Sequence, residues 1–286
     1  MNLTLGTAQF GSRYGVANEG GVVPPADVSA ILDCARASGV DMLDTAVAYG
    51  KSEQVLGSVG LEGFYVVSKL PRLPDECVDV MGWVYRQTLG ALYRLRCSSL
   101  YGVLLHAPSQ LLGSRGRELY GALLALKEAG LVCKVGISVY DTDELEQLCS
   151  RYSFDLVQAP LNILDRRLVD SGWNTKLSQM GVEIHCRSVF LQGLLLMPPE
   201  KRPSFFSAWP EVWQAWDSWL LKTGLTPLEA CIQYMSTVDS IDRVIVGVDS
   251  LIQLKQIIAA GEGRLRSLPD IPSVGDGRLL NPAMWG

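Results

Sequence analysis

Short apolar runs rich in β-forming residues alternate with longer stretches of helical periodicity along the chain, and this alternation most constrains how it can fold. Segments long enough for a helix lie between the runs, for example at residues 25–38, 77–96, 117–129 and 143–151. This pattern is typical of repeated strand-helix units around a parallel sheet. Eight apolar runs are present, at residues 3–7, 42–45, 64–68, 100–105, 133–138, 156–159, 182–186 and 243–246.

The number of units favours a closed barrel. Eight units in 286 residues average about 36 residues each, close to what a (β/α)8 barrel requires. An open doubly wound sheet is the alternative, but GTAQFG at residues 6–11 lacks the GxGxxG spacing of a dinucleotide-binding turn. We predict one α/β domain over residues 1–286, a (β/α)8 TIM barrel with its active site at the carboxyl ends of the strands. The tail from about residue 268 is rich in Pro and Gly, and we expect it to be irregular, packed over one end of the barrel or loose.

Charge and composition exclude several classes of function. The chain has 25 basic and 30 acidic residues, without the basic patch that nucleic acid or an anionic membrane surface requires. Two histidines and seven irregularly spaced cysteines without a CxxC pair give no metal-ligand pattern, so we predict no metal. The cysteines are expected to be reduced and mostly buried, as in a cytoplasmic protein, and no apolar stretch of membrane-spanning length is present. The sequence does not predict the oligomeric state.

Ionisable residues follow three successive predicted strands. Asp44 lies near the end of the second run and Tyr49 follows it, while Lys69 follows the third run and His106 the fourth. Each alone has a structural explanation, as a helix cap, a solvated rim residue or a core histidine. Together they can protonate a carbonyl oxygen: Lys69 would lower the pKa of Tyr49, Asp44 would hold Lys69, and His106 would orient or polarise the carbonyl.

At this point the sequence resembles the aldo-keto reductase superfamily. The resemblance rests on motifs in family order over nearly the whole chain: GTAQFG, LDTAVAYGKSEQVLG, VSKL, LLHAP, KVGIS, VQAPLNILDRR and VIVGVDS. It implies a (β/α)8 barrel, a nicotinamide cofactor, and reversible hydride transfer to an aldehyde or ketone. It also implies that Tyr49 is the proton donor and that Asp44, Lys69 and His106 complete a catalytic tetrad.

Around the nicotinamide, some residues match the family pattern and others depart from it. It implies that Ser138 and Gln158 bind the carboxamide, but Val139 stands where family members usually have Asn, and Asn162 is a candidate substitute. Arg187 stands at the position of a stacking aromatic residue. Its guanidinium could lie on the ring, reach an anionic group of the substrate, or pair with an acid across the barrel mouth. The cofactor residues that follow it are Ser188, Gln192 and Gly193.

The segment after the eighth run is either a plain helix cap or the binding site for the adenosine ribose. Its cofactor candidates are Gly247, Asp249, Ser250 and Gln253. The family usually has a basic residue here for the 2′-phosphate of NADPH. An acid favours free ribose hydroxyls, so Asp249 predicts a weaker preference for NADPH, and the cofactor is left as NADPH or NADH.

The leading interpretation is an NAD(P)H-dependent oxidoreductase acting on a small carbonyl compound or the corresponding alcohol. The main alternative is a cofactor-binding regulatory or partner subunit of the same fold with little turnover, although the intact tetrad argues against it. Tyr14 and Phe10 are candidate pocket aromatics. The spacing of Trp209, Trp213, Trp216 and Trp219 favours packing on a helix face.

Overall fold

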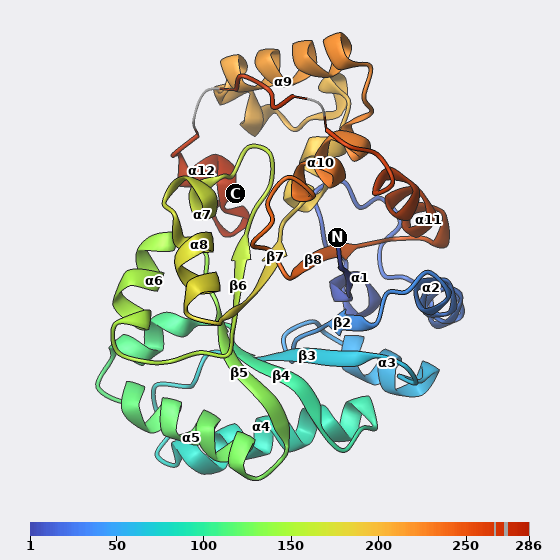
Figure 1. Cartoon of the computed structure of the whole chain (residues 1–286). Coiled ribbons are helices and arrows are strands. Elements are labelled where there is room, and N and C mark those ends of the chain that lie inside the picture. The colour runs from blue at the N-terminus through green and yellow to red at the C-terminus, as the bar shows by residue number, and fades with distance from the viewer. Residues whose placement is uncertain (266, 272–273, 286) are drawn as a thin grey trace.

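The computed structural model describes residues 1–265, 267–271 and 274–285. Its eight parallel strands close into a barrel in the sequence order β1 to β8, with helices around the outside (Figure 1). Both the predicted fold class and the position of every predicted strand are confirmed. The strands are β1 (Leu3–Gly6), β2 (Met42–Asp44), β3 (Tyr65–Leu70), β4 (Leu100–Leu105), β5 (Val132–Ser138), β6 (Leu156–Pro160), β7 (Glu183–Arg187) and β8 (Arg243–Gly247).

The helices follow local sequence signals. α2 begins with Pro25 at its first position, where a missing N–H costs nothing, and α10 begins with a capping box between Thr226 and Glu229. The α-helices are α1 (Ala8–Gly11), α2 (Pro25–Ala37), α3 (Ser52–Val59), α4 (Val80–Leu95), α5 (Gly116–Glu128), α6 (Thr142–Cys149), α7 (Arg167–Asp170), α8 (Trp173–Gln179), α9 (Pro210–Thr223), α10 (Pro227–Met235), α11 (Leu251–Ala260) and α12 (Gly277–Leu280). The 3₁₀ helices are η1 (Pro108–Leu112), η2 (Leu191–Leu196), η3 (Pro199–Lys201), η4 (Ser204–Ala208) and η5 (Pro282–Met284).

Strand alternation places the polar side chains inside the barrel. Successive side chains of a strand point to opposite faces, so Asp44 shares its face with Met42, and Lys69 shares its face with Val67. Met42 and Val67 belong to a small apolar cluster that is separate from the main core and contains Leu104 and Leu156. This cluster fills the middle of the barrel. The polar residues next along β2 and β3 therefore lie at its carboxyl end.

The opposite end of the barrel is closed by a polar group around Glu183. The Tyr101 hydroxyl donates to Glu183 Oε2 at 2.7 Å, and His185 Nε2 lies 2.7 Å from Glu183 Oε1. Lys134 Nζ also donates to the Glu183 carboxylate. These three partners come from β4, β5 and β7, so one carboxylate joins three strands.

The C-terminal tail is more ordered than its composition predicted. It contains α12 and η5, which begin where Asp276 and Asn281 accept hydrogen bonds from the backbone N–H groups of Arg278 and Ala283. Leu279 and Leu280 are buried, and the ring of Trp285 packs edge-on against Phe206 with centroids 4.8 Å apart. The expectation of an irregular tail is wrong for this part, because the capping side chains and the apolar contacts stabilise short helices.

The tryptophan cluster is structural, as its spacing predicted. Trp213, Trp216 and Trp219 of α9 are buried, and Trp216 stacks on Trp219.

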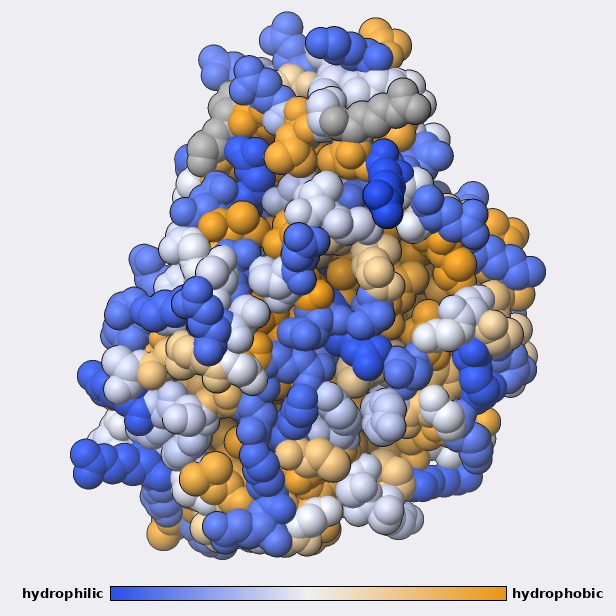
Figure 2. Space-filling model, viewed as in Figure 1, coloured by the Kyte–Doolittle hydropathy of each residue, from blue (hydrophilic) through white to orange (hydrophobic). Residues whose placement is uncertain are grey.

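Of the seven cysteines only Cys186 and Cys231 are buried, so the expectation of mostly buried thiols is wrong. Most of the other cysteines lie in or beside the outer helices. Hydrophilic and hydrophobic residues are mixed over the face seen in Figure 2. Among the described residues, no helix is both long and apolar enough to span a bilayer.

Candidate active site

The predicted tetrad is brought together at the carboxyl end of the barrel. Lys69 Nζ donates to Asp44 Oδ1 at 2.5 Å, to the carbonyl oxygen of Thr45 at 3.0 Å and to the hydroxyl of Tyr49 at 3.4 Å. The rings of Tyr49 and His106 meet edge to face, with centroids 6.0 Å apart. One buried ammonium thus connects a carboxylate to a phenol, and an imidazole flanks that phenol.

Close backbone packing positions the Tyr49 side chain. A Cβ added to Gly11 would lie 1.9 Å from the carbonyl oxygen of Tyr49, so only glycine lets α1 approach the Tyr49 turn this closely. Gly50 has φ +56°, a left-handed conformation that glycine adopts at little cost. Gly11 therefore lets α1 pack against the turn, and Gly50 lets the chain reverse direction directly after Tyr49.

The environment keeps these groups in defined protonation states. Burial raises the pKa of Tyr49, the negative charge of Asp44 raises it further, and Arg187 opposes this rise. The expected lowering of the Tyr49 pKa by Lys69 is not found, because burial dominates and the ammonium is paired with Asp44. Burial also lowers the pKa of Lys69. Burial, with the positive charges of Lys69 and Arg187, lowers the pKa of His106 to about 4, so its imidazole is neutral at pH 7.

A large cavity opens beside the tetrad. It has a volume of about 730 Å³, and Asp44 and Tyr49 line one part of it. It extends to Thr226 at the start of α10 and to Gln256 on α11. Its volume lies within the usual range of ligand pockets, roughly 300–1,000 Å³.

Similarity to a known family and to solved structures places the chain among known proteins. The sequence profile of the Aldo/keto reductase family matches residues 2–267. The chain belongs to the aldo/keto reductase family. This membership agrees with the sequence resemblance, and it implies the family's general chemistry, carbonyl oxidoreduction with a nicotinamide cofactor.

Solved structures of this family share the fold. The holo form of the aldo-keto reductase AKR11C1 from Bacillus halodurans has a TM-score of 0.74 and 20% identity, with 97% of this chain and 95% of that chain covered. A putative aldo-keto reductase from Pseudomonas aeruginosa has a TM-score of 0.67 and 21% identity, with 91% of this chain and 88% of that one covered. No curated protein sequence matches the chain significantly.

The two residues implied to bind the carboxamide, Ser138 and Gln158, lie behind the side chain of Asp44 and do not themselves form the wall of the cavity. Gln158 Nε2 donates to Asp44 Oδ2 at 2.7 Å, and the Ser138 hydroxyl donates to Gln158 Oε1 at 3.4 Å. Both side chains are buried. Together they extend the tetrad into a chain of hydrogen bonds that runs from Tyr49 through Lys69 and Asp44 to β5 and β6.

Asn162 is held by other contacts. Its side-chain oxygen accepts from the backbone N–H groups of Leu164 and Asp165, and its amide nitrogen donates to the carbonyl oxygen of Ser188. Both ends of the amide are therefore engaged by the backbone. In this structure Asn162 anchors the loop after β7 rather than replacing the missing Asn at position 139.

Arg187 lies at the cavity wall without an acidic partner among the described residues. Its guanidinium carbon is 4.3 Å from the ring centre of Tyr140. Its Nη1 donates to the Ser188 hydroxyl at 3.1 Å and its Nη2 to the carbonyl oxygen of Val139 at 3.0 Å. Of the three alternatives for Arg187, pairing with an acid across the mouth is not found among the described residues, because a backbone carbonyl, a hydroxyl and an aromatic ring hold the guanidinium instead.

The segment after β7 has an unusual backbone. Ser188, Leu191, Gln192 and Gly193 all have positive φ, between 48° and 90°. Residues other than glycine adopt this conformation at a cost, and such costs concentrate at functional sites. Ser188, Gln192 and Gly193, which were predicted as cofactor contacts, line the cavity.

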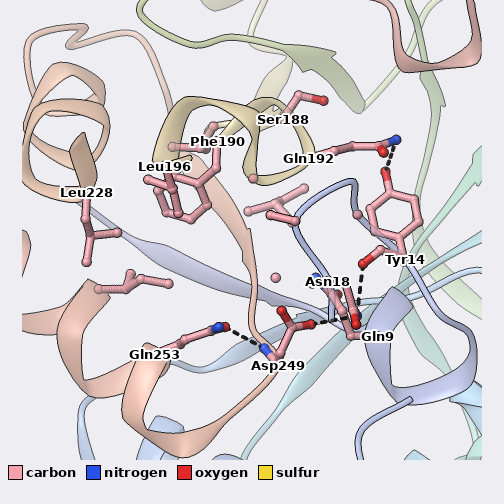
Figure 3. Close-up of a pocket in the computed structure, with 18 of the residues that line it drawn as sticks. Gln9, Tyr14, Asn18, Ser188, Phe190, Gln192, Leu196, Leu228, Asp249 and Gln253 are labelled. Carbon is pink, nitrogen blue, oxygen red and sulfur yellow. Dashed lines mark hydrogen bonds between the residues drawn. The ribbon is translucent and has the colours of Figure 1, made fainter. Parts of the chain in front are cut away.

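A loop after β1 crosses the cavity and joins both of its sides. The backbone N–H of Val16 donates to the carbonyl oxygen of Gln192 at 3.1 Å, and Gln192 Nε2 donates to the hydroxyl of Tyr14 at 3.4 Å. On the other side, Asn18 Nδ2 donates to Asp249 Oδ1 at 3.0 Å (Figure 3). The loop thus spans from the segment after β7 to the segment after β8.

The predicted residues after β8 have different roles. Gly247, Asp249 and Gln253 line the cavity, and Gln253 Oε1 accepts from the backbone N–H of Asp249 at 2.7 Å. The Ser250 side chain accepts from the backbone N–H of Gln253. Ser250 is thus the N-cap of α11 and is absent from the residues that line the cavity, so its prediction as a cofactor contact is not supported there.

Sequence reasoning missed several residues of the site. Asn18 and Tyr140 carry no motif, and their positions depend on loops that meet only in the folded chain. Gln9 belongs to the GTAQFG motif and to α1, but that motif alone does not indicate that its side chain lines the cavity. Tyr14 lines the cavity as suggested, whereas Phe10 is buried in the main core. The position of Tyr140, two residues after Ser138 at a strand end, is a signal that could have been used.

Proposed function

We propose that this protein reversibly reduces an aldehyde or ketone, with Tyr49 donating the proton to the carbonyl oxygen. The observation that carries the proposal is the position of Lys69 Nζ, which contacts both the Asp44 carboxylate and the Tyr49 hydroxyl. A proton donor must carry its proton at the working pH. The raised pKa of Tyr49 keeps its hydroxyl protonated, and the adjacent ammonium can stabilise the phenolate that forms.

His106 would orient the carbonyl group. Because its pKa is about 4, the neutral imidazole can donate one hydrogen bond to the carbonyl oxygen without competing as an acid. In the direction of alcohol oxidation, the same phenol oxygen accepts the proton. Gln158 and Ser138 support this arrangement, since they fix the second oxygen of the Asp44 carboxylate.

The cavity is suited to a nicotinamide cofactor. It extends from Tyr49 to α11, and amide side chains and glycine backbone from three segments line it. When bound, a reduced nicotinamide supplies the hydride to the carbonyl carbon. The residues that would hold it are Ser188, Gln192, Gly193, Gly247, Asp249 and Gln253.

The charge at the far end of the cavity favours an unphosphorylated ribose. Arg187 is the only basic residue among the described residues that line the cavity, and it belongs to the end near Tyr49. The family resemblance assigns the segment that contains Asp249 to the adenosine ribose, and an acid there would repel a 2′-phosphate, because like charges repel. We therefore propose that NADH binds at least as well as NADPH.

The Tyr49→Phe variant tests the proposed function. It keeps the ring and removes the proton, so we expect kcat to fall by about 10²–10⁴-fold, the usual contribution of a general acid. Cofactor affinity, measured by fluorescence titration, should stay nearly constant. Unchanged turnover in this variant would refute the assignment of Tyr49, and cofactor binding without turnover in the wild type would favour a cofactor-binding partner subunit.

A further inference from the structure

The cavity contains one cation that the proposed chemistry does not use. Among the described residues lining it, the other charged side chains are Asp44, Asp249 and Glu229. Asp44 is paired with Lys69, and no ion pair joins Arg187 to any carboxylate of the described residues. A cation at a partly desolvated wall is costly unless it meets an anion. Arg187 is thus a charge without a counter-charge beside the reacting groups.

The guanidinium is held in place before any ligand arrives. Tyr140 packs against its face, and among the described residues two acceptors bind its N–H groups, the carbonyl oxygen of Val139 and the hydroxyl of Ser188. An arginine has five N–H donors in a planar fork that matches a carboxylate or a phosphate. Three donors therefore remain available, and the stacking on Tyr140 reduces the entropy lost when an anion binds.

The positive charge of Arg187 affects the pKa values of groups at the proposed reaction site. Burial raises the pKa of both Tyr49 and Tyr14, and the positive charge of Arg187 opposes that rise in both. Its charge also helps to lower the pKa of His106, after burial and Lys69. Arg187 and Tyr49 line the same cavity, so one bound molecule can contact both side chains.

We propose that the substrate is an aldehyde or ketone that carries a carboxylate or phosphate group, and that Arg187 binds this anionic group while the carbonyl oxygen meets Tyr49. This inference rests on the proposed function and adds a substrate class to it. Carboxylate and phosphate present the same chemistry to a guanidinium, so the experiment must separate them. It must also exclude an anionic group of the cofactor as the ligand of Arg187.

The test compares substrates that carry an anionic group with matched compounds in which that charge is masked or absent. Succinic semialdehyde is paired with its methyl ester, and glyceraldehyde 3-phosphate with glyceraldehyde. In the wild type we expect kcat/KM for at least one anionic member to exceed that of its neutral partner by on the order of 100-fold, as for a desolvated charge pair. The pair with the larger ratio identifies the anion.

Variants of Arg187 test whether the ratio of kcat/KM between anionic and neutral substrates depends on its side chain. In Arg187→Met the ratio should fall close to 1, and Arg187→Lys should keep part of it, because it retains the charge and loses the planar fork. Lys201→Met is the matched control: Lys201 is an exposed cation outside the cavity lining, and its loss should leave the ratio unchanged. A second readout, independent of turnover, is calorimetric binding of oxamate to the cofactor-bound protein, which should be lost in Arg187→Met. If Arg187→Met does not fold, the Lys variant and the oxamate titration decide.

The outcomes separate the two proposals. A wild type that reduces neutral and anionic members equally well overturns the substrate class and leaves the proposed function standing. A ratio that survives in Arg187→Met, with cofactor affinity reduced instead, shows that Arg187 serves the cofactor and also overturns the inference. A folded wild type that binds no nicotinamide cofactor and turns over no carbonyl overturns the proposed function, and the inference with it.

Discussion

His106 is the residue whose ionisation would be most visible in a pH profile. Burial, together with Lys69 and Arg187, lowers its pKa from 6.5 to about 4. The imidazole is therefore neutral above about pH 5 and gains a proton only below that. We expect kcat/KM to show no transition near the usual histidine pKa of about 6.5.

The His106→Asn variant checks this expectation. Asn keeps an N–H donor but holds it on a shorter side chain away from the position of the imidazole donor, so kcat/KM should fall by about 10²-fold, while the profile between about pH 5.5 and 8 keeps its shape. A transition near pH 6.5 in the wild type that disappears in the variant would mean that the imidazole is charged in the working enzyme.

Asp249 is the residue that should set the choice of cofactor. Asp249→Asn removes the charge and keeps the size, so the ratio of NADPH to NADH dissociation constants should shift in favour of NADPH by on the order of tenfold, about 1.4 kcal/mol. Titration of both cofactors measures it. Asp239→Asn, an exposed acid outside the cavity lining, is the control. A wild type that strongly prefers NADPH would contradict the proposed role of Asp249.

At the scale of single elements, β7 joins both ends of the barrel. Its inward positions place Glu183 and His185 at the closed end and Arg187 at the cavity. Hydrogen bonds from His185, Lys134 and Tyr101 lower the pKa of Glu183 to about 2, against the opposing effect of burial. The site at one end of β7 thus depends on a strand that is fixed by ionic contacts at the other end.

The Glu183 contacts predict an acid-sensitive stability. A carboxyl whose pKa is lowered on folding contributes stability above its unfolded pKa, which for a glutamate is the ordinary value of 4.5, and that stability is lost as the pH falls from 4.5 to about 2. Glu183→Gln should therefore lower Tm by several degrees at pH 7, and the difference from the wild type should narrow below about pH 4.5. The exposed Glu128→Gln serves as control. A gap in Tm that does not depend on pH would show that Glu183 acts through packing alone.

At the scale of the whole molecule, the features that could be predicted from the sequence are those that follow from its hydrophobic periodicity. The order of apolar runs predicted all eight strands, and the ends of those runs singled out Asp44, Lys69 and His106. It did not predict that Gln158 binds Asp44, that Asn18 reaches Asp249, or that Arg187 stacks on Tyr140. Each of these contacts joins segments far apart in the chain, and it depends on loop conformations that no local pattern specifies. The tail was misjudged because its capping residues are effective only when Leu279 and Leu280 can be buried.

The most direct test of the central claim is a titration of the purified protein with NADH and, separately, NADPH, following the fluorescence of its seven tryptophans, with carbonyl turnover measured on the same sample. We predict saturable binding of both cofactors, with NADH bound at least as tightly, and turnover that depends on Tyr49. A folded sample that binds neither cofactor would contradict the account.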